Sequence, residues 1–261
     1  LLHIRHGLVR VDQRGVAFEQ DDVALAINML TGGIYWQGFQ VFFLPLIEEF
    51  GWSRASLSLA FSFREMETGI GAPIVGVLVD RLGPRRIIML SGFVMGLGMM
   101  LLALTQNLIM FYAFFILASL GASGTSHAIS WSVVVSRWFR RKRGTAIGVA
   151  MSGPVLSGPV LMVLAWGLDT VGWRWTVAAA GALLWFTVIP LANVVRDYPS
   201  TMGLLPDGDA AEPASVVPAA AGAPAAPPRG AVVEHGYTVR EALTSSAFWL
   251  LAGVLTCLFF G

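Results

Sequence analysis

Three charged residues, Arg64, Glu65 and Glu67, lie inside an apolar run that extends from about residue 55 to residue 79. Counted from Ala55 at about 1.5 Å per residue, they lie roughly 13 to 18 Å along a helix, near the middle of a hydrocarbon core about 30 Å thick. An ionised side chain at that depth costs at least about 2.5 kcal/mol. The group therefore needs ion-pair partners, an aqueous cavity or a change of protonation state.

The spacing of these residues predicts which of them pair. Arg64 and Glu67 are three residues apart, so they share a helix face and are close enough to pair. Glu65 is turned about 100 degrees from Arg64 and is expected to point elsewhere. One interpretation is a site in a water-accessible pathway, with Glu67 as a candidate proton carrier and Arg64 as its partner or as a contact for an anion. The other is a neutralised pair that holds this helix against a neighbour.

Two further groups of polar residues lie in apolar runs. Tyr35, Trp36, Gln37 and Gln40 are within two helical turns of one another, and could bind a small solute or form hydrogen bonds between helices. His127 lies beside small residues at 121–126, where helices approach closely, so it is a candidate substrate contact or a packing residue. Both interpretations stay open for each group.

The composition places these candidate residues in a membrane protein. Of 261 residues, 56% are apolar and 13% are charged, and the formal net charge is +1. Apolar runs of about 20 residues, the length of bilayer-spanning helices, are nearly free of charge, whereas the segments between them hold almost all the charged residues. The basic residues occur in short loops rather than along one stripe, so we expect a lipid bilayer and no nucleic acid as partner.

No pattern in the sequence would hold a cofactor or a metal, or would make the protein an enzyme. Cys257 is the single cysteine, which rules out an internal disulfide and a cysteine metal cluster. The sequence around Lys142, the single lysine, lacks the glycines of a phosphate-binding loop. We therefore expect no catalytic residue, no metal and no cofactor.

These observations predict an all-α membrane protein with one six-helix bundle. A polar tail, 1–22, precedes the bundle, and an Ala- and Pro-rich linker, 196–246, separates it from the start of a seventh span at 247–261. We expect both ends of the chain to be truncated, the second inside span seven. The predicted spans one to six are at about residues 23–47, 55–79, 87–104, 108–135, 144–168 and 175–195, within a domain of residues 23–195.

The distribution of arginine and lysine predicts the orientation, because cations in short loops are retained on the cytoplasmic side. The loop after span two holds Arg81, Arg85 and Arg86, and the loop after span four holds five cations. The loops after spans one and five hold only Arg54 and Arg174. The amino terminus and the linker are therefore expected to be cytoplasmic.

A short repeat relates the loops after spans two and five. Asp80-x-x-Gly83-x-Arg85 matches Asp169-x-x-Gly172-x-Arg174, and the two loops are predicted to lie on opposite sides of the membrane. Inverted three-helix repeats would place them so, although three matched positions could also arise by chance.

Glycine spacing predicts close helix packing and bends. Gly92-x-x-x-Gly96 and Gly144-x-x-x-Gly148 are typical of helices that pack backbone to backbone. Gly153-Pro154 and Gly158-Pro159 are candidate bending points in span five.

The loop Gly76-x-x-x-Asp80-Arg81-x-Gly83-x-Arg85-Arg86 resembles the signature loop of the major facilitator superfamily, at the place between spans two and three where that family has it. Other segments resemble its monocarboxylate and oxalate/formate branch. They are residues 38–46, residues 49–54, Arg137-Trp138-Phe139 through Arg143-Gly144-Thr145-Ala146 with Gly148, Glu241-Ala242-Leu243 and Phe248-Trp249.

The resemblance implies a twelve-span protein of two six-helix bundles in the plasma or inner membrane, monomeric when full length. It would move a small organic anion, a monocarboxylate or a dicarboxylate such as oxalate, by alternating access with proton symport or anion exchange. The residues Gly76, Asp80, Arg81, Gly83, Arg85 and Arg86 would form a cytoplasmic gating motif, in which Asp80 faces a helix amino terminus and Arg81 and Arg85 form ion pairs.

Departures from that branch and two rival functions qualify the resemblance. Span one has no lysine, unlike some proton-coupled monocarboxylate carriers, and the branch's substrate-binding cations lie beyond Gly261. One rival is an exporter of drugs or hydrophobic solutes. The other is a membrane-embedded sensor or assembly subunit that transports nothing.

Overall fold

The computed structural model describes residues 13–125, 130–139, 142–196, 244–246 and 249–250, and these contain helices and no strands. Two units are distinguished, Leu1–Glu212 and Pro213–Gly261. Of the predicted seventh span only 249–250 are described, and most of the predicted linker lies outside the described residues. The helices of the first unit are α1 (Gln13–Thr31), η1 (Gly32–Gln37), η2 (Gly38–Phe42), α2 (Phe43–Phe50), α3 (Arg54–Leu82), α4 (Pro84–Leu102), α5 (Leu108–Thr125), α6 (Ser132–Trp138), α7 (Arg143–Met151), η4 (Gly153–Ser157), α8 (Gly158–Val171) and α9 (Trp173–Val194).

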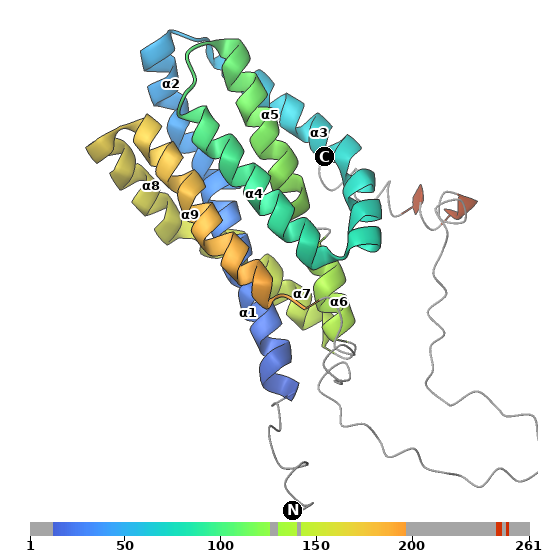
Figure 1. Ribbon diagram of the computed structural model, residues 1–261. Coiled ribbons are helices and arrows are strands. Elements are labelled where there is room, and N and C mark those ends of the chain that lie inside the picture. Colours follow the sequence, from blue (N-terminus) through green and yellow to red (C-terminus); the bar gives the residue numbers. More distant parts are fainter. Residues whose placement is uncertain (1–12, 126–129, 140–141, 197–243, 247–248, 251–261) are drawn as a thin grey trace, which may run out of the picture. The chain divides into compact units, whose positions relative to one another are not determined.

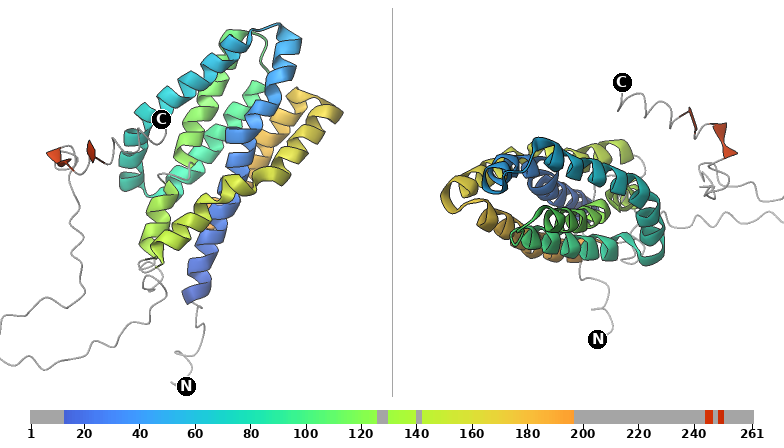
Figure 2. Two further views of the ribbon diagram at one scale, coloured as in Figure 1. Left: turned by 180° about the vertical axis from the view of Figure 1, so that it is seen from behind. Right: turned by 90° about the horizontal axis from the view of Figure 1, so that it is seen from above.

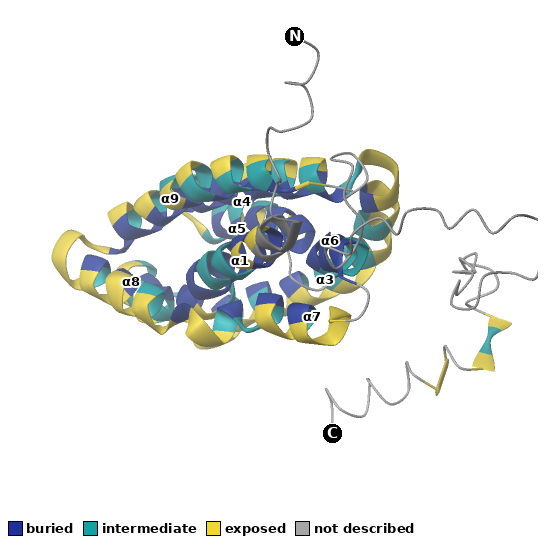
Figure 3. Cartoon of the chain, turned by 90° about the horizontal axis from the view of Figure 1, so that it is seen from below, coloured by how far each residue is buried: buried dark blue, intermediate teal, exposed yellow. Residues whose placement is uncertain are grey.

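The helices of the first unit form a bundle with buried residues inside it and exposed residues on its rim (Figures 1 and 3). Seen along the bundle, α4 and α9 lie side by side, α7 and α8 lie on the other side, and α1 and α5 lie between them (Figures 2 and 3). Many large apolar side chains on the rim are exposed, among them Ile109, Trp166, Trp175 and Phe186. A rim of this composition suits contact with lipid.

Four helical segments are long and apolar enough to cross a membrane by length and composition: Pro84–Leu102, Leu108–Thr125, Arg143–Val171 and Trp173–Val194. The 29-residue α3 is not among them, because Arg64, Glu65 and Glu67 lie in its middle. The predicted span one is not among them either, because its helix is interrupted between Thr31 and Phe43.

Local sequence explains where α3 begins and ends. The hydroxyl of Ser53 accepts a hydrogen bond from the Ser56 amide at 3.1 Å, so Ser53 caps the start of α3. At the other end Gly83 has φ 83° and ψ 149°, a conformation that is accessible essentially to glycine alone. The chain can therefore turn at once into α4, whose first residue is Pro84.

The turn between α8 and α9 repeats the turn between α3 and α4. Gly172 has φ 84° and ψ 164°, and its amide donates to Leu168 as the Gly83 amide donates to Val79. Each glycine follows a helical stretch of 29 residues, Arg54–Leu82 or Arg143–Val171. The repeat predicted from three residues therefore extends to the backbone conformation of the glycine and to the length of the helical stretch before it.

The two turns lie at opposite ends of the bundle, because α4 and α9 are antiparallel. Arg85, at the start of α4, donates to the side chain of Asn193 near the end of α9 at 3.0 Å. Arg174, at the start of α9, donates to the carbonyl of Ala103 just after α4 at 2.7 Å. Figure 1 shows the α3–α4 turn at the lower end and the α8–α9 turn at the upper left. This arrangement is the inverted relation that the sequence suggested.

Two predicted spans are broken rather than continuous. The span predicted at about 23–47 lies within helical residues 13–50, but η1 and η2 separate its two α-helical parts, α1 and α2. In span five, η4 separates α7 from α8 at Gly153-Pro154, which confirms a departure from α-helix there. The two breaks meet: a Cβ on Gly32 would lie 3.0 Å from Pro154, and one on Gly33 would lie 2.9 Å from the Cβ of Ser157.

Glycine packing is confirmed for α4 but not for α7. A Cβ on Gly92 would lie 2.5 Å from Val188, and one on Gly96 would lie 2.3 Å from Trp185. The absence of a side chain at both positions therefore lets α9 pack closely against α4. Gly144 and Gly148 have nothing within 4 Å of an added Cβ in the described part of the chain. The prediction of close packing through these two residues is therefore wrong for that part.

Candidate functional site

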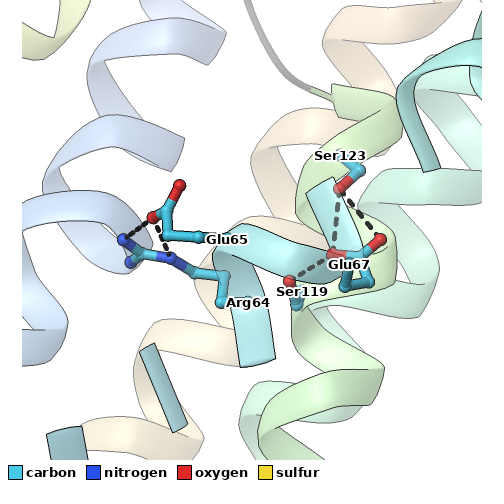
Figure 4. Close-up of polar contacts among 5 residues, drawn as sticks. All are labelled: Arg64, Glu65, Glu67, Ser119 and Ser123. Atoms are coloured by element: carbon cyan, nitrogen blue, oxygen red, sulfur yellow. Dashed lines mark hydrogen bonds and ion pairs between the residues drawn. The ribbon is translucent and has the colours of Figure 1, made fainter. Parts of the chain in front are cut away.

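The side chain of Arg64 is buried in the middle of α3, with a residue exposure of 9%. Its Nη2 and Nε atoms donate to the same carboxylate oxygen of Glu65, at 2.6 and 3.2 Å (Figure 4). The predicted pair of Arg64 with Glu67 is therefore wrong. The long arginine side chain lets the guanidinium reach the adjacent residue, although the two Cβ atoms leave the helix about 100 degrees apart.

Aromatic rings hold the guanidinium of Arg64 in place. Its Cζ atom lies 4.7 Å from the ring centroid of Trp36 in η1 and 4.8 Å from that of Phe61, one turn earlier in α3. Stacking on a ring face stabilises a partly desolvated cation. The Nη1 atom of Arg64 is buried and has no hydrogen-bond partner among the described residues. The guanidinium of Arg64 is therefore held in place, while the two N–H groups of its Nη1 donate no hydrogen bond to the described residues.

Glu67 points away from Arg64 and toward α5 (Figure 4). Ser119 donates to one oxygen of its carboxylate at 2.5 Å, and the hydroxyl of Ser123 lies 3.1 and 3.2 Å from the two oxygens. Ser119 and Ser123 are one turn apart, so both project from the same face of α5. The carboxylate joins two helices, as the second of the two interpretations of this group proposed, but through serines rather than through Arg64.

The candidate residues of span one separate into three environments. Tyr35 is fully buried, with its ring 5.8 Å from those of Trp36 and Phe115, and its hydroxyl has no hydrogen-bond partner among the described residues. Gln37 donates to the carbonyl of Pro154 and accepts from Ser157, so it joins the two helix breaks. Gln40 is exposed. His127 lies outside the described residues.

Sequence reasoning missed the contacts of Arg64 with Glu65 and with the ring of Trp36, and it missed the two serines that hold Glu67. A signal for the serines was present, because Ser119 and Ser123 form the only hydroxyl pair four residues apart in the otherwise apolar segment 108–123. The stacking of Arg64 depends on the break in span one, which the apolar pattern did not predict.

The loop after α3 carries the residues of the predicted gating motif. Arg85 donates to Asn193, while Asp80, Arg81 and Arg86 are exposed. Gly83 makes the turn, and Gly76 has open space around an added Cβ. The bond from Arg85 to Asn193 thus joins the start of α4 to the end of α9.

The equivalent turn at the other end of the bundle is more tightly held. Arg174 donates to Glu49 at 2.7 Å and stacks on the rings of Trp173 and Phe50, and the indole N–H of Trp173 donates to Glu49. Partial burial raises the pKa of Glu49, but the hydrogen bonds from Trp173 and Arg174 outweigh it and hold the pKa below its ordinary value. Together with the bond to Ala103, these contacts tie the ends of α2, α4 and α9 together.

Comparison with known proteins agrees with this architecture. The sequence profile of the Major Facilitator Superfamily matches residues 24–261. The chain belongs to the major facilitator superfamily. A solved bacterial homologue of the human lysosomal transporter Spinster, inward-facing and unoccupied, superposes with a TM-score of 0.56 at 17% identity, over 78% of this chain and 47% of that one. At this identity the likeness shows the fold alone. A superfamily member with these helices is an integral membrane protein.

Curated relatives of this superfamily member include several monocarboxylate transporters. Monocarboxylate transporter 13 of Rattus norvegicus is 30% identical over 152 residues, 56% of this chain and 34% of that protein. Monocarboxylate transporter 7 of Homo sapiens is 27% identical over 162 residues, 60% of this chain and 30% of that protein. The uncharacterized MFS-type transporter YhjX of Escherichia coli is 27% identical over 198 residues, 74% of this chain and 43% of that protein. The chain thus spans less than half the length of these relatives.

Proposed function

We propose that this superfamily member is a secondary active transporter of small organic anions, either monocarboxylates or dicarboxylates of the oxalate/formate type. It works by alternating access, with proton symport or anion exchange. The observation that carries the proposal is Arg64, a buried cation in the middle of α3 whose Nη1 has no hydrogen-bond partner in the described part of the chain. The names of the monocarboxylate transporters among its relatives support the same substrate class.

The surroundings of Arg64 suit an organic carboxylate. A guanidinium binds a carboxylate through two parallel N–H bonds, and such charge-assisted bonds are roughly twice as strong as neutral ones. The rings of Trp36, Phe61 and Phe39 supply an apolar surface nearby, since Phe39 and Phe61 lie 6.0 Å apart. A small anion with a hydrocarbon part therefore finds both a charge partner and an apolar wall.

The other candidate residues take supporting roles in the proposal. Tyr35, Gln37, Gln40 and His127 line the substrate pathway, and Glu67 fixes α3 against α5 beside it. The loop from Gly76 to Arg86 is the cytoplasmic gate, and the amino terminus is cytoplasmic. The protein acts as a monomer in the plasma or inner membrane.

Counterflow in liposomes tests the proposal. The full-length protein is reconstituted, loaded with unlabelled lactate or oxalate, and assayed for uptake of the labelled acid. Saturable flux is expected in the wild type, at least a tenfold lower flux in Arg64→Gln, and near wild-type flux in Arg54→Gln, which removes an exposed cation from the same helix.

Three results would contradict the proposal. Equal flux in Arg64→Gln and Arg54→Gln would separate transport from the buried cation. Flux of hydrophobic solutes without flux of acids would favour an exporter of such solutes. Absence of any saturable flux from a correctly inserted protein would favour a sensor or an assembly subunit.

A further inference from the structure

Two grooves lie along the face where α4 and α9 pack side by side (Figure 3). The Arg86 groove has a volume of about 370 Å³ and is lined by Arg86, Met89, Leu90, Phe93 and Ile189. The Arg174 groove has a volume of about 470 Å³, and its lining includes Leu97, Met100, Leu101, Leu104, Ala178 and Arg174. Each groove is therefore apolar apart from one arginine.

The two arginines lie at opposite ends of this face, about one hydrocarbon core apart. Arg174 donates to the carbonyl of Ala103 at 2.7 Å, and Ala103 lies 17 residues beyond Arg86 in the sequence. At about 1.5 Å per residue the separation along α4 is roughly 26 Å, close to the hydrocarbon thickness of about 30 Å. Each arginine is therefore placed at the level of the phosphates of one leaflet.

A pair of stacked rings separates the two grooves. The rings of Phe93 and Trp185 are 4.9 Å apart and inclined by 4°, and the indole N–H of Trp185 donates to the carbonyl of Phe93 at 2.8 Å. On α4 the Arg86 groove ends at Phe93, and the Arg174 groove begins at Leu97. The face thus offers two separate grooves, one in each half of the bilayer.

We infer that each groove binds one phospholipid, whatever solute the protein moves, with an acyl chain on the apolar lining and the phosphate on the arginine. A guanidinium binds a phosphate through two parallel N–H bonds. Both arginines also lie in the first turn of a helix, where the peptide dipoles favour an anion. Trp175, beside Arg174 and 73% exposed, suits the membrane interface. Phospholipid supplies a phosphate at both ends of a face that is apolar between them.

The charges around the two arginines select different headgroups. Residues 80–86 contain three arginines and one acid, and Arg85 donates to the neutral amide of Asn193. Arg174 already pairs with Glu49 at 2.7 Å, and the two side chains are 37% and 40% exposed. The Arg86 groove therefore favours an anionic headgroup. A headgroup with its own ammonium suits the Arg174 groove, because that ammonium can meet the carboxylate of Glu49.

Photo-crosslinking of the full-length protein in liposomes tests this inference. The probes are a phosphatidylglycerol and a phosphatidylcholine with the same diazirine-bearing acyl chain, and labelled residues are mapped by mass spectrometry. Both grooves should be labelled more strongly than Phe186, which is 80% exposed on α9 and lines neither groove. The ratio of phosphatidylglycerol to phosphatidylcholine label should be about fivefold higher at residues 86–93 than at residues 97–104, the factor expected for one cation near an anionic surface.

Two pairs of variants locate the sites. Arg86→Gln should lower the phosphatidylglycerol label in its groove about fivefold. Arg81→Gln, which removes an exposed cation of the same turn outside the groove, should leave that label unchanged. Ala178→Phe should fill the other groove and lower its labelling by both probes, whereas Ala179→Phe, at a neighbouring residue outside that groove, should not.

The labelling results decide between a lipid site and its alternatives. Equal labelling of Phe186 and of the two grooves would overturn the inference, because it would mean that lipid covers the rim without specific sites. Protein-to-protein cross-links through residues 86–104 without lipid label would overturn it in favour of a second copy of the chain. Equal probe ratios in both grooves would overturn the headgroup assignment, and these wild-type ratios decide if Arg86→Gln does not reach the membrane. Labelling is measured without transport, so absence of flux would overturn only the proposed function.

Discussion

The contact between Glu67 and Ser119 can be measured as a coupling energy between α3 and α5. Ser119 donates to the carboxylate at 2.5 Å, whereas the single hydroxyl proton of Ser123 is shared between two oxygens at 3.1 and 3.2 Å. Hydrogen bonds to charged groups contribute about 1.5–3 kcal/mol in soluble proteins. Helix-to-helix hydrogen bonds in a membrane protein average about 0.6 kcal/mol, with a maximum of about 1.7. A hydroxyl that donates to a carboxylate group is expected near that maximum.

We therefore expect about 1–2 kcal/mol of coupling between Glu67 and Ser119, and about 0.5 kcal/mol between Glu67 and Ser123. The assay is a double-mutant cycle of wild type, Ser119→Ala, Glu67→Leu and the double variant. Unfolding of each protein in mixed micelles by a denaturing detergent is followed by tryptophan fluorescence. Leucine removes both the charge and the acceptor, and the cycle subtracts its effects on burial.

Ser62→Ala provides the control, since Ser62 is exposed on the same helix as Glu67. Its coupling to Glu67→Leu should be near zero. A coupling between Glu67 and Ser119 no larger than this control value would refute the reasoning, because it would mean that the carboxylate does not hold α5. A larger coupling for Ser123 than for Ser119 would contradict the assigned geometry.

Three further predictions concern stability and are checked by thermal unfolding of the purified protein. Gly96→Ala should lower the free energy of unfolding by about 1–3 kcal/mol, because its Cβ would overlap Trp185, whereas Gly148→Ala, in open space, should be neutral or stabilising by up to about 1 kcal/mol. Glu49→Gln should lower the Tm at neutral pH. Because the pKa of Glu49 is held below its ordinary value, the difference between variant and wild type should persist above about pH 4.5 and shrink as the pH falls through the lowered pKa. Gly172→Ala should cost about 1–3 kcal/mol, because its φ of 84° with ψ of 164° excludes other residues, and an unchanged Tm would show that the turn can relax.

Helix positions were largely predictable because each depends on local composition. Apolar runs bounded by charged or Gly-Pro turns placed α3, α4 and α9 within a few residues of their observed bounds, whereas the span predicted at 108–135 contains α5, which ends at Thr125, and the start of α6. The interruption of span one was not predictable in this way. Residues 32–42 are as apolar as their neighbours. The break depends on close packing, in which Pro154 and Ser157 of η4 lie against Gly32 and Gly33.

The sequence identified the charged residues of α3 but not the residues with which they pair. Depth in the bilayer singles out Arg64, Glu65 and Glu67, because three charges in an apolar run need partners. Sequence spacing compares only residues of one helix, so it selected Glu67 as the partner of Arg64. The partners that decide the arrangement come from elsewhere, Trp36 for Arg64 and Ser119 for Glu67, and their proximity arises from the packing of α3 against η1 and α5.

The repeat of the two turns relates the charged residues of α3 to the break in span five. Arg64 precedes Gly83 by as many residues as Gly153 precedes Gly172, so Arg64 and the start of η4 occupy equivalent positions in the two repeats. The break in span one contacts both of them, since Trp36 stacks on Arg64 and Gln37 binds the carbonyl of Pro154. Irregular helix leaves backbone groups that need polar partners, and a buried cation needs an anion. The span-one break thus contacts both α3 and η4, which is why we propose the substrate site beside it rather than at the exposed loops.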